Sequence, residues 1–170
     1  MVDKLAVIDF DDTLVRTNTK IIVYWKKKQK EFNTNQIKDA YKFAERRDAE
    51  IDYSEFAKPI TRQNIKAINY SLISKIRQDD VLILTARGEG ETIKNLFKQH
   101  FKLNFDVIAL KDIYDDKKDG LLIAQRKSEE LKLYLKQKSY KFINVYDDQL
   151  SNLAKIKGAL PQVNIHFVKF

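Results

Sequence analysis

Cysteine is absent from the 170-residue chain, and glycine and proline are scarce, with 4 and 2 residues. Without cysteine the protein has no disulfide framework, no thiolate metal site and no cysteine nucleophile. With so few glycines and prolines, the sequence shows no linker that would separate independent domains. A chain of this length can bury a substantial core, so we expect a single domain over residues 1–170.

Long hydrophobic runs are also missing. No apolar stretch approaches the roughly 20 residues that cross a bilayer, and the first residues show no signal-peptide pattern. Hydrophobic residues make up 44% of the chain and charged residues 33%, a balance typical of globular proteins in water. We therefore expect a cytoplasmic protein with no membrane contact and no stable protein partner, in line with the absence of cysteine.

The net charge of +8 falls in one part of the chain. Between Arg16 and Arg77 there are 15 Lys and Arg residues against 7 Asp and Glu, whereas the rest of the chain is neutral overall. A lysine-rich stretch is often only a solvated surface, but it can also attract a phosphorylated small molecule or a nucleic acid. The stretch is too long for one crossover, so we expect residues 16–77 to form a basic, cap-like insertion followed by a crossover helix.

Five short apolar runs predict the strands of a covered parallel sheet, because they are continuous rather than alternating. These runs are Leu5–Ile8, Val81–Leu84, Phe105–Leu110, Phe142–Tyr146 and Val163–Phe170. Helical patterns lie between most of them. We therefore expect an α/β fold with an open, doubly wound parallel sheet, a Rossmann-like core.

Helical spacing of apolar residues predicts three helices, and a stretch rich in helix formers from Ser128 to Lys138, with Ser128 as candidate cap, predicts a fourth. In the core they begin at Thr61, after the Gly88–Gly90 turn and at Ser128, and their apolar positions include Ile65, Ile68, Leu72, Ile76, Ile93, Leu96, Phe97 and Phe101. In the insertion, the helical spacing of Ile37, Ala40, Tyr41 and Ala44 predicts the remaining helix. Lys20–Trp25 fits a strand or a helix. We expect a small helical cap after the first strand.

Polar side chains follow these elements at the points where the strands end. Asp9, Asp11 and Thr13 follow the first strand, Thr85 and Arg87 the second, Lys127 opens the late helix, and Asp147 and Asp148 end the fourth strand. In open parallel sheets, ligands bind outside the carboxyl ends of the strands. The topology therefore predicts that these groups gather at one site.

With these motifs in this order, the chain resembles the haloacid dehalogenase-like (HAD) superfamily of phosphohydrolases. A strand ending Asp-x-Asp-x-Thr, a strand ending in Thr, a lysine at a helix start and a strand ending in paired acids are its four motifs. The Thr-Ala-Arg at Thr85 is also similar to the polynucleotide phosphatase and nucleotidase branches. The resemblance implies a HAD core with a cap and a Mg2+-dependent phosphomonoesterase acting on a nucleotide or a nucleic-acid terminal phosphate.

The resemblance also implies a role for each residue. Asp9 would form an aspartyl-phosphate, and Asp11 would protonate the leaving oxygen and then deprotonate the attacking water. Thr85 and Lys127 would stabilise charge on the phosphate. Asp9, the backbone carbonyl of Asp11 and an acid of the pair Asp147–Asp148 would hold Mg2+.

Several assignments stay open. Lys111, Lys117 and Lys118 are alternatives to Lys127, and Asp148 could be a helix cap, which would leave Asp147 as the metal ligand. Arg87 could bind substrate phosphate or be solvated. Thr13 could contact substrate or only hold its loop, and Asp12 fits a turn residue.

Three other functions compete with the phosphatase. A phosphotransferase or mutase would use the same chemistry. A basic nucleic-acid-binding protein would carry out no catalysis. A phosphoacceptor signalling domain also carries paired acids, a Thr and a Lys on a parallel sheet, but its paired acids come first, whereas here they come last.

Overall fold

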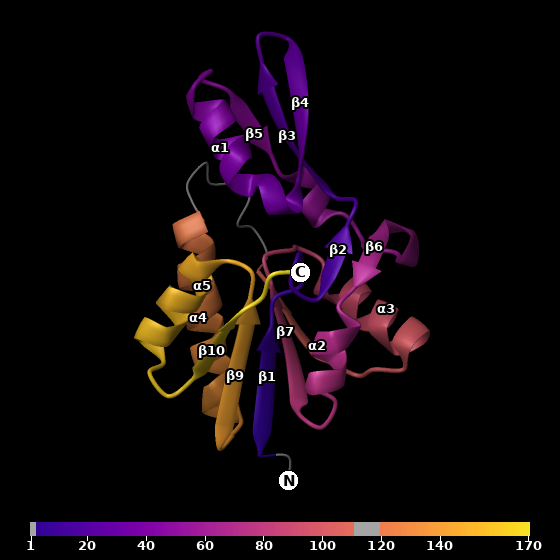
Figure 1. The fold of residues 1–170 in the computed structure, drawn as a ribbon, viewed down its shortest axis with the longest axis vertical. Helices are drawn as coiled ribbons and strands as arrows, with labels where there is room; N and C mark the ends of the chain where they lie inside the picture. Colours follow the sequence, from indigo (N-terminus) through magenta and orange to yellow (C-terminus); the bar gives the residue numbers. More distant parts are fainter. Residues whose placement is uncertain (1–2, 111–119) are drawn as a thin grey trace.

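A computed structural model describes residues 3–110 and 120–170 of the chain. Its core is a five-stranded sheet in the order β10-β9-β1-β7-β8, with every neighbouring pair parallel (Figure 1). The strands are β1 (Lys4–Ile8), β7 (Asp80–Thr85), β8 (Asp106–Ala109), β9 (Phe142–Asp147) and β10 (Asn164–Phe167). Each coincides with a predicted run, so the α/β class with a parallel sheet is confirmed.

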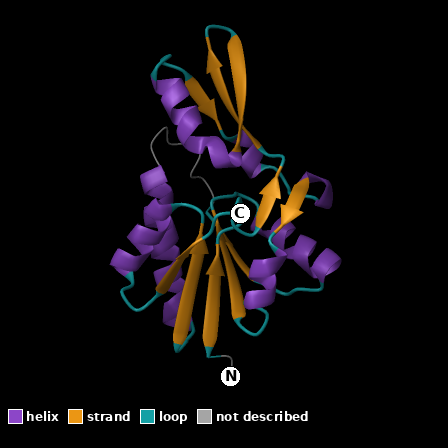
Figure 2. Cartoon of the chain, in the orientation of Figure 1, coloured by secondary structure: helices purple, strands orange, loops and turns teal. Residues whose placement is uncertain are grey.

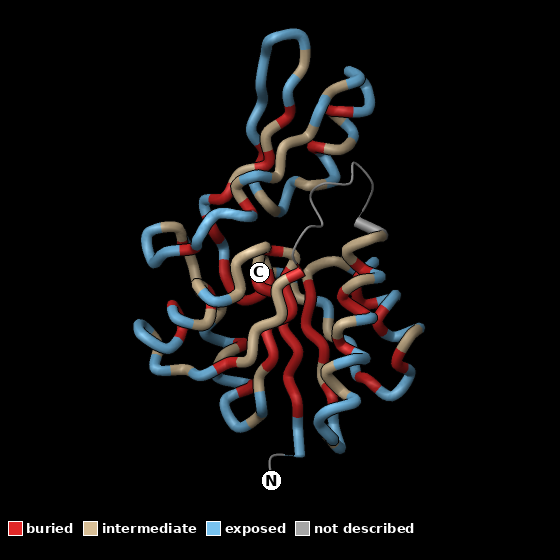
Figure 3. Tube along the Cα trace, turned by 180° about the vertical axis from the view of Figure 1, so that it is seen from behind, coloured by how far each residue is buried: buried red, intermediate tan, exposed pale blue. Residues whose placement is uncertain are grey.

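Helices cover both faces of this sheet (Figure 2). Ala6 and Ile8 of β1 pack in a cluster with residues of α2 (Tyr70–Lys75) and α3 (Gly90–Phe101). Leu5 and Val7 pack in another cluster with residues of α4 (Gly120–Gln137) and α5 (Leu150–Ala159). The central strands are therefore buried along most of their length (Figure 3). No helix among the described residues is long and apolar enough to cross a membrane.

The order of the strands creates a switch point beside β1. The chain runs from β1 to β7 and β8 on one side, and then returns to β9 and β10 on the other. At the carboxyl ends of β1 and β9, Ile8 lies opposite Tyr146, and the Asp9 amide donates a hydrogen bond to the Tyr146 carbonyl over 2.9 Å. Open α/β sheets bind ligands at such a reversal of strand order.

The segment between β1 and β7 carries most of the additional structure. A short strand, β2 (Val15–Thr17), leads into a three-stranded antiparallel sheet in the order β4-β3-β5, with bounds Lys28–Asn33, Lys20–Trp25 and Glu50–Asp52. Helix α1 (Ile37–Glu45) packs on this sheet, next to the 3-10 turns η1 (Thr34–Gln36) and η2 (Ser54–Ala57). The predicted α1 is confirmed, but the expected helical insertion is wrong, because the β-branched run of β3 pairs with two further strands.

Two core helices differ from the sequence prediction. Thr61 precedes only a 3-10 turn, η3 (Arg62–Asn64), and the next residues form β6 (Ile65–Ile68), which pairs antiparallel with β2. Helix α2 starts after Asn69, whose side chain accepts a hydrogen bond from the Leu72 amide. Isoleucine suits a strand as well as a helix, so a distant partner strand overrides the helical spacing. Helix α4 starts at Gly120, not at Ser128.

Candidate active site

The three acids after β1, Asp9, Asp11 and Asp12, line a common cavity because the chain turns sharply there. Asp12 has a left-handed backbone, with φ of 59°, and the amides of Leu14 and Val15 both donate to the Phe10 carbonyl. This confirms Asp12 as a turn residue. Asp9 is buried, whereas the Asp11 side chain is 15% exposed, and both line the same cavity.

Lys127 joins the ends of β1 and β9. Its Nζ lies 2.6 Å from Asp9 Oδ1 and 2.8 Å from Asp147 Oδ2, and its side chain is only 2% exposed. It lies well inside α4 rather than at a helix start, and the Ser128 hydroxyl donates to the Gln125 carbonyl of the preceding turn instead of capping a helix. The alternatives Lys111, Lys117 and Lys118 lie outside the described residues.

Burial governs the charges of this cluster. It raises the pKa of Asp9 well above the usual range; Lys127 opposes this shift, while Asp147 and Asp148 add to it. Burial alone would lower the pKa of Lys127, but attraction to Asp147 and Asp9 outweighs it and leaves that pKa above its usual value. Lys127 is therefore a protonated ammonium held among buried carboxylates.

The paired acids have different partners. Asp147 Oδ1 accepts the Gln149 amide over 2.8 Å, and the Asn152 side-chain amide lies 3.0 Å from both Asp147 oxygens. Among the described residues, the only hydrogen bond to the Asp148 carboxylate comes from the side-chain amide of Gln149, over 2.7 Å. Asp148 is therefore not a helix cap, and the backbone amide is bound by Asp147. Burial, reinforced by Asp147, raises the pKa of Asp148 to about 6.

Asp9, Asp147 and Asp148 fit a divalent cation. Each offers a carboxylate oxygen, and these atoms lie within 4.8 Å of one another. Mg2+ prefers such hard oxygen ligands and tolerates a site that leaves room for water. Because both Asp147 oxygens already accept hydrogen bonds, Asp9 and Asp148 have more capacity left for a metal. The predicted contribution of the Asp11 carbonyl stays a prediction.

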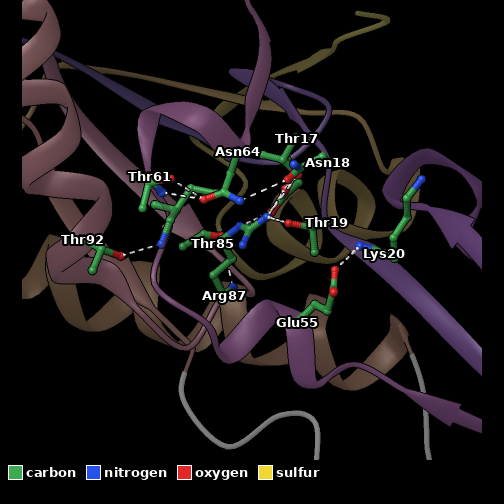
Figure 4. A network of polar contacts seen from close by, with 12 residues as sticks. Thr17, Asn18, Thr19, Lys20, Glu55, Thr61, Asn64, Thr85, Arg87 and Thr92 are labelled. Atoms are coloured by element: carbon green, nitrogen blue, oxygen red, sulfur yellow. Dashed lines mark hydrogen bonds and ion pairs between the residues drawn. The ribbon is translucent and has the colours of Figure 1, made fainter.

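Arg87 is fully buried beside Thr17 and Thr19, as Figure 4 shows, and the Asp11 carboxylate holds its guanidinium. Its Nε and Nη2 each lie 2.8 Å from one Asp11 oxygen, a bidentate geometry. Nη2 also lies 2.7 Å from Thr19 Oγ1 and 3.2 Å from Thr17 Oγ1, and the rings of Phe10 and Phe56 each lie 5.4 Å from the guanidinium carbon.

This arrangement corrects the interpretation of Arg87 as a solvated side chain, whereas its contact with a substrate phosphate stays a prediction. The side chain is not solvated, and it does not line the cavity. It positions the Asp11 carboxylate and ties it to Thr17 and Thr19, at the root of the insertion. Sequence reasoning missed both threonines, since about 70 residues separate them from Arg87 and neither belongs to a motif.

The two motif threonines lie in different surroundings. Thr85 lines the cavity, and its Oγ1 accepts a hydrogen bond from the Arg87 amide, so its hydroxyl proton is available to donate elsewhere. Thr13 is fully buried and does not line the cavity, and its hydroxyl has no partner within the described parts of the chain. Contact of Thr13 with substrate therefore stays a prediction, as does its alternative role in holding the loop after β1.

A cavity of about 350 Å3 lies between the sheet ends and the insertion. Its charged and polar side consists of Asp9, Asp11, Asp12, Thr85, Lys127, Asp148, Gln149, Ser151 and Asn152. The insertion contributes Thr34, Ile37, Lys38, Tyr41 and Phe56, and Ala86 and Ile123 complete the wall. The predicted carboxylates, Thr85 and Lys127 are thus brought together beneath a partly aromatic roof. Comparison of the chain with protein-family models, curated proteins and solved structures gives no match.

Proposed function

We propose that the protein is a Mg2+-dependent phosphomonoesterase that acts through an aspartyl-phosphate on Asp9. The observation that supports this most is the buried Lys127 ammonium, which contacts both Asp9 and Asp147 at the floor of the cavity. A cation in this place offsets negative charge on a carboxylate nucleophile and on an incoming phosphate. The order of the motifs, which resembles that of the HAD superfamily, supports the same chemistry.

The reaction divides into two displacements. In the first, a carboxylate oxygen of Asp9 attacks phosphorus, the bond to the leaving oxygen breaks, and Asp11 gives that oxygen a proton. In the second, the Asp11 carboxylate takes a proton from water, whose oxygen attacks phosphorus and releases phosphate from Asp9. Arg87 keeps Asp11 in one orientation through both steps, and Thr85 donates its free hydroxyl proton to a phosphoryl oxygen.

Asp9 and Asp148 would hold Mg2+, with Asp147 beside them. When bound, the cation supplies positive charge that reduces repulsion between the carboxylate and the phosphate. Asp147 also holds Lys127 and the first turn of α5, so its hydrogen bonds keep the ligand pair in place.

The insertion side of the cavity favours a leaving group with an apolar ring. Tyr41 and Phe56 provide aromatic surface, Ile37 and Ile123 provide aliphatic surface, and Lys38 adds a cation. Such a wall suits the nucleoside part of a nucleotide or of a nucleic-acid end better than the hydroxyl-rich body of a sugar phosphate.

The test is phosphate release with Mg2+ from nucleotides, sugar phosphates and 3′- or 5′-phosphorylated oligonucleotides. Asp9→Asn should lower turnover more than about 100-fold, because the amide keeps the shape of the side chain but removes the nucleophile. The matched control Asp39→Asn, at an exposed position of α1, should leave turnover unchanged. Mass spectrometry of acid-quenched wild-type protein should find a phosphoryl group on the peptide containing Asp9.

Retention of more than a hundredth of wild-type turnover by Asp9→Asn would contradict the assignment. A phosphotransferase is distinguished in the same assay, because the phosphoryl group would then appear on an added alcohol or sugar rather than as inorganic phosphate.

A further inference from the structure

The tip of the β3–β4 hairpin has residues that its backbone does not favour. Only Lys26 and Lys27 connect the two strands, and both are left-handed, with φ of 41° and 62°. A two-residue loop of this kind prefers Asn and Gly, since Gly lacks the Cβ that causes strain there and the short Asn side chain can hydrogen-bond locally, whereas lysine has neither advantage. The requirements of the turn therefore do not explain two successive lysines.

The cations around this tip are not compensated. Residues 20–33 contain five lysines and one acid, Glu31. Lys26, Lys27, Lys28 and Lys30 are exposed, and no ion pair within residues 3–110 and 120–170 involves any of them. Like charges held this close repel one another, so the hairpin gains from an anion that lies across them.

Aromatic rings lie among these cations. Trp25 and Phe43 pack edge to face with centroids 4.9 Å apart, and the Arg47 guanidinium and the Lys30 ammonium lie 3.8 and 4.6 Å from the Phe43 centroid. A hollow of about 320 Å3 at the tip is lined by Tyr24, Trp25, Lys26, Lys27, Lys28 and Gln29. Tyr24 is 40% exposed. An exposed Tyr24 and a half-buried Trp25, beside lysines without ion pairs in the described part of the chain, are the combination that binds single-stranded nucleic acid, through base stacking and backbone contacts.

We propose that the β3–β4 tip binds a single-stranded nucleic acid at nucleotides remote from its end. A six-residue strand extends about 20 Å, and Figure 1 shows the β3–β4 tip at the far end of the insertion from the carboxyl ends of β1 and β9. A single strand is favoured over a duplex because its bases are free to stack on Tyr24 and Trp25. Delivery of the strand's terminal phosphate to the cavity rests on the proposed phosphatase function, whereas binding at the tip does not.

Trp25 is the only tryptophan of the chain, so its fluorescence reports on this surface directly. Titration with a hydroxyl-ended single-stranded oligonucleotide of about 10 nucleotides should quench it saturably, and added salt should weaken the binding steeply. Lys26→Glu/Lys28→Glu/Lys30→Glu should weaken binding at least about 10-fold at low salt. The matched control Lys132→Glu/Lys136→Glu/Lys155→Glu, with the same change in charge on exposed positions of α4 and α5, should weaken it less than about 2-fold. The Trp25→Leu variant should also bind the oligonucleotide more weakly, which is measured by the fluorescence anisotropy of a labelled oligonucleotide because the variant has no tryptophan.

Equal weakening by the two triple variants would overturn the location of the surface. Equally tight binding of a duplex or of polyglutamate would overturn the assignment to single strands. Tip-dependent binding without phosphatase activity on any substrate would refute the proposed function and leave the surface in place. Phosphatase activity without tip-dependent binding would refute the binding surface and leave the proposed function in place.

Discussion

Cations in the core and in the insertion occupy opposite environments. Lys127 and Arg87 are no more than 2% exposed and lie within 2.8 Å of carboxylate oxygens. Lys26, Lys27 and Lys28, at the tip of the insertion, are exposed and have no ion pair among the described residues. A buried charge is tolerated only when it is compensated, whereas an exposed charge costs little and acts on distant anions.

The two groups of cations therefore have different roles: those in the core hold carboxylates in place, and those at the tip attract anions from solution. The core cations hold Asp9, Asp11 and Asp147 in one arrangement, and their removal should be felt as lost stability and lost catalysis. The tip cations hold no group of the described chain, so their removal should be felt mainly in salt-dependent binding.

The largest effect is expected from Lys127→Met, which leaves Asp9 and Asp147 buried without their cation. The free energy of unfolding should fall by about 3–5 kcal/mol, measured by urea denaturation without metal. Mg2+ should restore part of the loss, because it binds only the folded site. Lys132→Met, an exposed position of the same helix, should change it by less than about 0.5 kcal/mol. A similar loss of unfolding free energy in Lys127→Met and Lys132→Met would show that the ion pairs of Lys127 do not stabilise the fold.

A smaller loss is expected from Arg87→Lys, which keeps the charge but removes the bidentate contact with Asp11. The free energy of unfolding of the variant should be about 1.5–3 kcal/mol lower than that of the parent. Its kcat should fall, whereas its KM should change little. Arg77→Lys, at an exposed position, is the matched control. If KM rose and kcat were unchanged, Arg87 would be a substrate ligand rather than a residue that positions Asp11.

Asp147→Asn and Asp148→Asn should have opposite effects on the metal-free protein. Asp147→Asn weakens the contacts of Lys127 and of the first turn of α5, so it should destabilise the fold. Asp148→Asn should stabilise it by about 1 kcal/mol at pH 7, because burial, reinforced by Asp147, raises the pKa of Asp148 to about 6. Both variants should need more Mg2+ for activity.

The pH dependence follows from the direction of this shift. The folded state binds the Asp148 proton more tightly than the unfolded state, in which the pKa is about 3.8. The stability from this group is therefore present below about pH 4 and is lost as the pH rises through 6. The gain from Asp148→Asn, measured as a difference in Tm in the presence of EDTA, should disappear at low pH. A constant gain between pH 4 and pH 7 would argue against the raised pKa.

The smallest effect is expected at the tip. Lys26→Asn/Lys27→Gly gives the left-handed loop the residues it prefers and should stabilise the protein by about 0.5–1 kcal/mol, or roughly 1–4 °C in Tm. The same variant should bind single strands more weakly, because two charges are lost. Exposed Lys132→Asn/Lys136→Gly, inside α4, should lower Tm instead. A tip variant with unchanged binding would mean that these two lysines take no part in it.

Continuous apolar runs made the core predictable. A parallel sheet covered on both faces requires such runs, and the helix carrying Ile93 and Phe97 has strong apolar spacing. The residues that end β1, β7 and β9 were also predictable, since parallel strands bring their carboxyl ends to one edge. By contrast, strand β4 (Lys28–Asn33) has three charged residues among its six and only one buried side chain, so this strand left no apolar pattern.

The sequence by itself determined the fold class, the gathering of Asp9, Asp11, Thr85 and the acid pair at one edge of the sheet, and the surplus of lysine between Arg16 and Arg77, whereas the structure places Lys127 among these acids. The local patterns of the sequence suffice for these features, because apolar runs, the residues that follow them and the distribution of charge are read along the chain without knowledge of distant partners. Only the tertiary structure decided that Arg87 holds Asp11 together with Thr17 and Thr19, that Ile65–Ile68 pairs with β2, and that Asp147 rather than Asp148 binds the start of α5. Each of these features depends on which groups meet after the chain has folded. The hydrogen bonds between Arg87 and Asp11, for example, join residues 76 positions apart.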